Sequence, residues 1–87
     1  MYVIIVYDVN VKRVNLMKKF LREYLHWIQN SVFEGELSRA ELRKVKYKIK
    51  QIIDEQNDTV KVYTVRNKKF LTIEELGESK VDLNSII

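Results

Sequence analysis

An uninterrupted run of β-branched and aromatic residues near the start of the chain, Tyr2–Tyr7, most constrains how this sequence can fold. Such a run is typical of a β-strand covered on both faces, because a strand with one solvated face alternates apolar and polar residues. The run ends at Asp8, and a helical pattern follows. With 87 residues, the chain is the size of one small domain. We therefore expect a single domain over residues 1–87.

The sequence predicts two amphipathic helices. The first begins after Asn10, a suitable N-cap, and carries apolar residues at three- and four-residue steps: Val14, Met17, Leu21, Tyr24 and Leu25. The second follows Ser38-x-x-Glu41, the pattern of a capping box. Its apolar positions recur at the same spacing: Leu42, Val45, Ile49 and Ile52.

The remaining segments predict strands. Residues 27–37 indicate one bent strand or two strands of a tight hairpin, residues 59–65 alternate as a strand, and Phe70–Ile73 is expected to form a last short strand. This order packs most simply as a ferredoxin-like α+β fold, an antiparallel sheet with both helices on one face. Because the first strand is apolar on both faces, we expect a second copy to cover the open face, in a two-fold, sheet-to-sheet homodimer.

Composition narrows the class of function. The chain has no cysteine and one histidine, which excludes disulfides, thiolate zinc sites, thiol nucleophiles and multi-histidine metal sites within one chain. No glycine-rich phosphate loop is present, which excludes Walker-type nucleotide hydrolysis. The longest apolar run is far shorter than the ~18 residues of a membrane span, and no signal-peptide pattern occurs. We expect a cytoplasmic protein that does not bind membranes.

Positive charge is concentrated in the body of the chain. The net charge is +4, but residues 1–70 carry 15 basic and 8 acidic side chains, whereas residues 71–87 carry 1 basic and 4 acidic ones. A basic body indicates a polyanionic partner such as nucleic acid, with a solvated surface as the alternative. The candidate contacts lie in the two predicted helices: Lys12, Arg13, Arg43, Lys44, Lys48 and Lys50.

Asp8 stands where the first strand meets the first helix. It either ends the strand and helps to cap the helix, or it binds a metal ion. One carboxylate is a poor magnesium site, but two brought together across a dimer axis could hold a hard cation through oxygen ligands. Such a cation orients water and neutralises charge on a scissile phosphate.

Three stretches resemble the Cas2 family of small CRISPR-associated adaptation proteins. Residues 2–9 resemble its opening strand, and residues 28–42 resemble its second signature, with the motif Gln29-x-Ser31-Val32-Phe33-Glu34-Gly35. Asp58-Thr59-Val60-x-x-Tyr63 resembles the strand after the second helix. The resemblance extends from Tyr2 to about Leu76. The chain departs from the family at Trp27, where many members have arginine, and at Leu25, where many have glycine. The family's early helix arginines have only approximate counterparts in Lys12 and Arg13.

The resemblance implies a ferredoxin-like homodimer with facing sheets, in which the C-terminal segment 70–87 reaches the partner subunit. It also implies a magnesium-dependent endonuclease acting on RNA or DNA, with one ion shared by the Asp8 residues of both subunits. Tyr7, Ser31 and Phe33 would support that site or face the substrate. A partnership with the larger CRISPR integrase during spacer acquisition is implied as well. The alternative function is a non-catalytic scaffold that bridges integrase subunits and clamps duplex DNA. A third possibility, a regulatory domain that binds a small molecule, has no supporting motif in the sequence.

Overall fold

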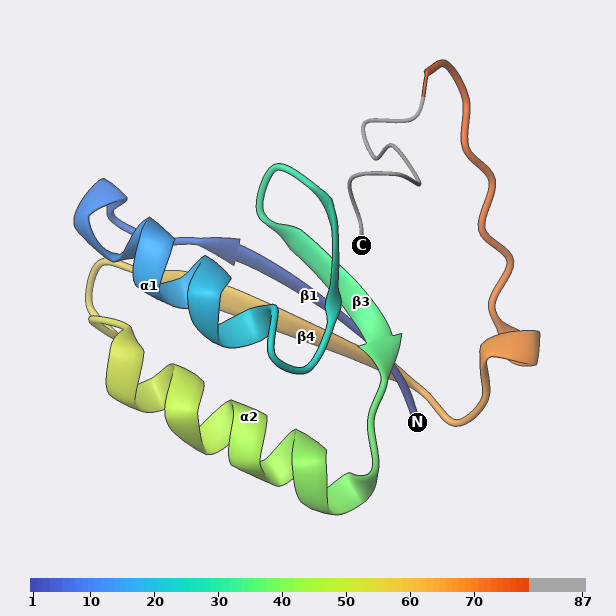
Figure 1. The fold of residues 1–87 in the computed structure, drawn as a ribbon, viewed down its shortest axis with the longest axis horizontal. Helices are drawn as coiled ribbons and strands as arrows, with labels where there is room; N and C mark the ends of the chain where they lie inside the picture. The colour runs from blue at the N-terminus through green and yellow to red at the C-terminus, as the bar shows by residue number, and fades with distance from the viewer. Residues whose placement is uncertain (79–87) are drawn as a thin grey trace.

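A four-stranded antiparallel sheet, in the order β2-β3-β1-β4, forms the centre of the structure. This computed structural model describes residues 1–78. Both helices lie against one face of the sheet (Figure 1), which confirms the expected α+β arrangement. The elements follow the chain as β1 (Tyr2–Asp8), α1 (Val11–Leu21), β2 (His26–Gln29), β3 (Val32–Glu36), α2 (Arg39–Ile52), β4 (Thr59–Val65) and the 3₁₀ turn η1 (Lys68–Phe70).

Strand β1 lies between β3 and β4, and its side chains alternate between the two faces of the sheet. Val3, Ile5 and Tyr7 belong to the hydrophobic core beneath the helices. The intervening side chains point to the opposite face, where Ile4 and Val6 are only half-buried. Among the residues that the structure describes, the continuous apolar run therefore has one face covered by the helices and one face open.

The predicted apolar positions of α2 all lie in the core: Leu42, Val45, Ile49 and Ile52. In α1, Met17 and Leu21 are buried as expected, but the helix ends at Leu21, so the predicted extension to Leu25 is wrong. A turn over residues 22–24 ends the helix and brings Leu25 into the core by another route. Leu25 packs closely over Gly35, where an added Cβ would lie 3.1 Å from the leucine Cδ2.

Residues 26–36 form a hairpin of two strands, which settles the alternative that the sequence left open. Asn30 in the turn has a φ of +41°, a left-handed conformation that asparagine tolerates better than most residues. Trp27 stabilises this turn, because its indole Nε1–H donates a hydrogen bond to the Asn30 carbonyl at 2.9 Å.

The short strand expected at Phe70–Ile73 is not formed within the chain. Lys68–Phe70 is a 3₁₀ turn, and the segment that follows it leaves the sheet without pairing to it (Figure 1). A strand requires a neighbouring edge for its hydrogen bonds, and residues 71–78 lie along none. The rest of the predicted partner-reaching segment, residues 79–87, lies outside the described residues. Within residues 1–78, no helix is long and apolar enough to cross a bilayer.

Candidate functional site

Asp8 is the last residue of β1, and its side chain is exposed to solvent. It stands opposite Thr59 of β4 in the sheet. Because the preceding Tyr7 points into the core, Asp8 points to the open face, away from the helices. The Asp8 carboxylate takes part in neither of the two ion pairs in the described part of the chain, which are Met1–Glu36 and Arg13–Asp58.

A second carboxylate, Asp58, is buried next to Thr59, the residue opposite Asp8, and it organises the neighbouring backbone. The Asn10 backbone N–H donates to Asp58 Oδ1 at 2.9 Å, and the Asp54 backbone N–H donates to Oδ2 at 2.9 Å. The Arg13 guanidinium donates to both oxygens, from Nε at 2.6 Å and from Nη2 at 3.0 Å. Asp58 therefore ties the β1–α1 junction to the start of β4, and these are the two segments that flank Asp8.

The ionised form of Asp58 is strongly favoured in this setting. Its bond with Arg13 is the largest cause, and the backbone donors of Asp54 and Asn10 add to it, so the pKa of Asp58 lies well below its ordinary value despite burial. Arg13 is held in place in return, with its side chain mostly buried. We therefore assign Arg13 a structural role, and the expected nucleic-acid contact at Arg13 is not supported.

Two of the three residues expected to support the site or face substrate lie inside the core. Phe33 is fully buried and Tyr7 nearly so, with their rings stacked at 6.2 Å between centroids. Both side chains point toward the helices, so neither lies on the open face that carries Asp8. Burial raises the pKa of Tyr7, whose hydroxyl has no hydrogen-bond partner among the described residues. Ser31 is half-buried, and its carbonyl accepts the Tyr7 backbone N–H at 3.1 Å, so the hairpin turn is joined to the end of β1.

The residues around Asp8 fit a magnesium ion only if a second chain contributes. Among residues 1–78, no group of three or more metal-ligating side chains occurs. Magnesium is commonly held by one or two carboxylates and keeps several waters, so the Asp8 residues of two chains would supply a sufficient set of hard oxygen ligands. Asp58 is unsuited to this role, because both of its oxygens already accept hydrogen bonds.

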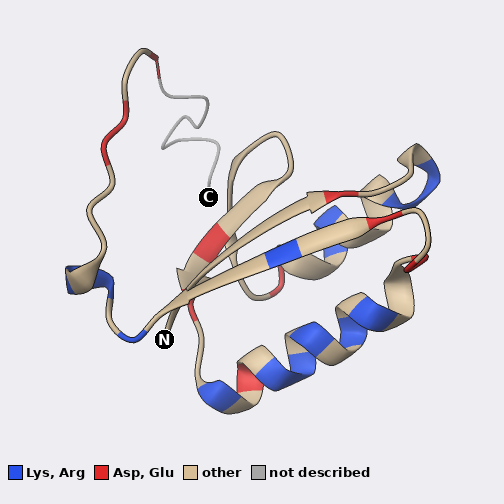
Figure 2. Cartoon of the chain, turned by 180° about the vertical axis from the view of Figure 1, so that it is seen from behind, with Lys and Arg blue, Asp and Glu red and all other residues tan. Residues whose placement is uncertain are grey.

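Positive charge is concentrated along α2, which is blue over much of its length in Figure 2. The predicted contacts on this helix are all exposed: Arg43, Lys44, Lys48 and Lys50. Lys12, in the first turn of α1, is exposed as well. Two further exposed residues lie on this helix, Lys46 and Tyr47. The candidate contacts did not include Tyr47, although its position outside the apolar spacing of the predicted helix already indicates an exposed side chain.

The chain matches one protein family over most of its length. Residues 1–73 match the family described as CRISPR associated protein Cas2. Two relatives called "CRISPR-associated endoribonuclease Cas2" align over the whole of both chains, one from Methanosarcina acetivorans at 54% identity and one from Pyrococcus furiosus at 49%.

Solved structures agree with this match. A structure called "Crystal structure of cas2" has a TM-score of 0.86 at 47% identity and covers 100% of this chain and 98% of the other. "Crystal structure of Streptococcus pyogenes Cas2 at pH 6.5" has a TM-score of 0.77 at 36% identity and covers 88% of this chain and 100% of the other. The agreement in sequence and in fold, together with the open-face carboxylate at the end of β1, shows that this chain belongs to the Cas2 family of CRISPR-associated proteins.

Proposed function

We propose that this protein is a magnesium-dependent endoribonuclease that works as a homodimer, with one ion shared by the two Asp8 carboxylates. The observation that carries the proposal is the position of Asp8, exposed on the open sheet face at the end of a rigid central strand. RNA is the favoured substrate because the relatives from Methanosarcina acetivorans and Pyrococcus furiosus are called endoribonucleases. We assign this activity to the cytoplasm, which the absence of cysteine supports.

The open face of the sheet supports the dimer. No helix of residues 1–78 covers it, and it presents half-buried Ile4 and Val6 together with Tyr63, which is 51% exposed. The segment after β4 carries three further exposed apolar side chains, Phe70, Ile73 and Leu76. A second copy packed on this face would bury these groups. The segment 70–87 would then reach the partner subunit, where Phe70–Ile73 would find the sheet edge that they lack in this chain.

Different residues of this chain would have separate roles in phosphodiester hydrolysis. A bound magnesium ion supplies a polarised water and neutralises charge on the scissile phosphate. Asp8 would hold that ion, and Asp58 would keep the Asp8 end of β1 in place through the Asn10 backbone. Lys12 lies in the first helical turn, where the helix dipole disfavours a cation, so a phosphate at this point would relieve an unfavourable charge.

A second candidate function is a non-catalytic scaffold that holds duplex DNA and the CRISPR integrase during spacer acquisition. It is favoured by the sparse site, because residues 1–78 hold no group of three possible metal ligands. A scaffold needs only the dimer and the basic surface of α2.

Cleavage assays with Asp8→Asn test the proposal. Wild type and variant are incubated with end-labelled single-stranded RNA and with duplex DNA over a magnesium series, with a chelator as the metal-free arm. We expect wild-type RNA cleavage that requires magnesium and a loss on the order of 100-fold in the variant, because the ligand for the ion is gone.

The matched control is Glu23→Gln, which removes an exposed carboxylate that takes part in no ion pair of the described chain. It should cleave like wild type. The dimeric state of each protein is measured first by sedimentation. Equal cleavage by wild type and Asp8→Asn would contradict the proposal. Absence of cleavage by both proteins, with duplex DNA binding retained, would favour the scaffold.

A further inference from the structure

The outer surface of α2 carries an aromatic side chain that the core does not use. Tyr47 is 68% exposed, whereas the apolar side of the same helix is buried. Four cations surround it, and together they line a shallow open groove of about 540 Å³. We call this surface the Tyr47 face, and it consists of Arg43, Lys44, Lys46, Tyr47 and Lys50.

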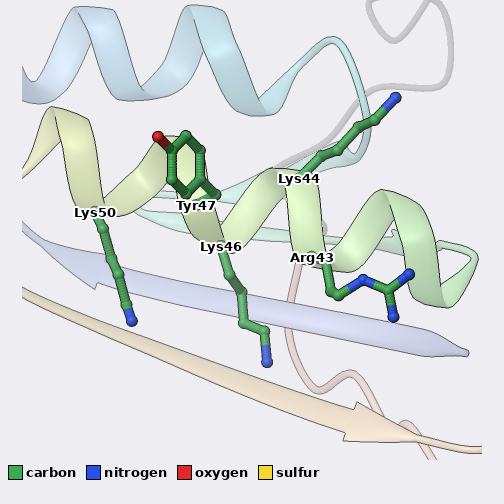
Figure 3. A pocket seen from close by; sticks show the side chains of 5 residues that line it. All are labelled: Arg43, Lys44, Lys46, Tyr47 and Lys50. Carbon is green, nitrogen blue, oxygen red and sulfur yellow. The ribbon is translucent and has the colours of Figure 1, made fainter.

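The cations are arranged on both sides of the ring. Figure 3 shows Arg43, Lys46 and Lys50 extending to one side of the helix and Lys44 extending to the other. Relative to Tyr47, the nearest of them stand at i−4, i−3 and i+3, which are the neighbouring positions on a helix surface. A strand that crosses the helix over the tyrosine ring would therefore meet positive charge on both sides of the helix.

A merely solvated helix surface does not account for this composition. Between residues 39 and 52 there are six basic side chains and one acidic side chain, Glu41. Glu41 is occupied at the helix N-terminus, where it accepts the Ser38 backbone N–H at 2.9 Å. Lys46 and Lys50 repel each other at i,i+4, and neither belongs to the ion pairs of residues 1–78. The surface carries a local energetic penalty that a polyanion would remove.

We propose that the Tyr47 face binds single-stranded nucleic acid, with one unpaired base stacked on the Tyr47 ring and the flanking phosphates against the surrounding cations. Stacking on aromatic side chains beside a basic groove is how proteins bind single strands without reading sequence. The inference rests on the proposed function and adds to it a binding site for the strand that is remote from Asp8, on the helix side of the sheet.

The size of the surface suits a short stretch of strand. Arg43 and Lys50 are seven residues apart, or about 10 Å along the helix axis, which corresponds to roughly three phosphates at ~3.4 Å per nucleotide. A duplex would meet the same cations, but its bases are stacked on each other and leave no free face for Tyr47. Selectivity for unpaired strands should therefore depend on the ring, and affinity for all nucleic acids on the cations.

Fluorescence anisotropy with three labelled 15-nucleotide probes tests this: oligo(U) RNA, an abasic strand with the same phosphates, and an RNA duplex. All proteins carry Asp8→Asn and the buffer contains a chelator, so binding is measured without metal or cleavage. Tyr47→Ala should weaken oligo(U) binding about tenfold and leave abasic and duplex binding within about twofold. Tyr47→Phe should retain wild-type affinity. An oligo(dT) arm shows whether the sugar matters.

The charge variant is the triple substitution Arg43→Gln, Lys46→Gln and Lys50→Gln. It should weaken binding of every probe and lower the slope of log affinity against log salt by about 2, at ~0.7 per phosphate contact. Lys19→Gln on α1 is the matched single-charge control, and it should leave tyrosine-dependent selectivity unchanged. Equal losses on oligo(U) and on the abasic strand in Tyr47→Ala would overturn the inference. So would an unchanged salt slope in the triple variant. Neither result would bear on cleavage at Asp8.

Discussion

At the scale of single residues, Asp58 is the group on which the geometry around Asp8 depends most directly. Its oxygens accept bonds from the backbones of Asn10 and Asp54 and from the Arg13 side chain. Removing the Asp58 charge would leave the mostly buried Arg13 guanidinium without its partner, and breaking a buried ion pair in this way is strongly destabilising.

Asp58→Asn should therefore lower the melting temperature at pH 7, by an amount on the order of 10 °C. The effect should depend on pH. The pKa of Asp58 is lower in the folded protein than its ordinary value of 3.8, so its stabilisation is fully present above that pH. As the pH falls below it, the unfolded chain takes up a proton that the folded chain does not, and the stabilisation is lost.

Thermal melts of wild type and Asp58→Asn between pH 3 and pH 8 measure this difference. The gap between the two melting temperatures should be widest near neutrality and should narrow below about pH 4. A gap that stays constant down to pH 3 would contradict the assignment.

Sequence reasoning found Asp8 but not this pairing, because Arg13 and Asp58 are 45 residues apart in the chain. The sequence placed Asp58 only in a stretch that resembles the strand after the second helix, and it placed Arg13 on a solvated or nucleic-acid-binding surface. Only the tertiary fold brings them together. The sequence held one clue. Asp58 directly precedes the alternating strand, and if its carboxylate is buried there, it requires a positively charged or hydrogen-bonding partner.

At the scale of elements, local signals were most reliable where backbone groups are satisfied within a few residues. The capping box of α2 is present as predicted: Glu41 N–H donates to Ser38 Oγ at 3.1 Å, and the Glu41 carboxylate accepts in return. These bonds with Ser38 lower the pKa of Glu41. In contrast, the length of α1 and the state of Phe70–Ile73 depend on contacts that no local pattern encodes.

Ser38→Ala should remove one half of this cap and destabilise the protein by about 1 kcal/mol. For a domain of this size the melting temperature should fall by roughly 4–8 °C. Ser38→Thr preserves the hydroxyl acceptor and should recover most of the loss. Differential scanning calorimetry measures both, and a melting temperature for Ser38→Ala equal to that of wild type would show that the cap contributes nothing.

At the scale of the whole molecule, the proposed dimer depends on the open face of the sheet. A sheet covered by helices on one side leaves the apolar residues of its other side in water, and a second copy is the simplest cover. The proposed magnesium site depends on the same assembly, because one chain supplies one Asp8.

Tyr63→Lys should disrupt the proposed dimer. Tyr63 is 51% exposed on β4, so the fold of one chain should tolerate the change, whereas a lysine buried between two sheets would be costly. Sedimentation velocity should show a shift from dimer toward monomer, with a loss of magnesium-dependent RNA cleavage. Tyr47→Lys makes the same substitution on the opposite side of the molecule and should remain dimeric. Identical sedimentation of wild type and Tyr63→Lys would contradict this interface.

The sequence by itself determined the order of the main elements, the buried faces of both helices, the α2 cap and the position of Asp8 at the end of a central strand. These depend on periodicity and short-range hydrogen bonds, which a linear pattern carries. The tertiary structure alone decided that Arg13 is bound to Asp58 and that Leu25 packs over Gly35. Both depend on contacts between residues that are separated in the chain, which no local pattern carries. Such relationships arise only when the elements pack together.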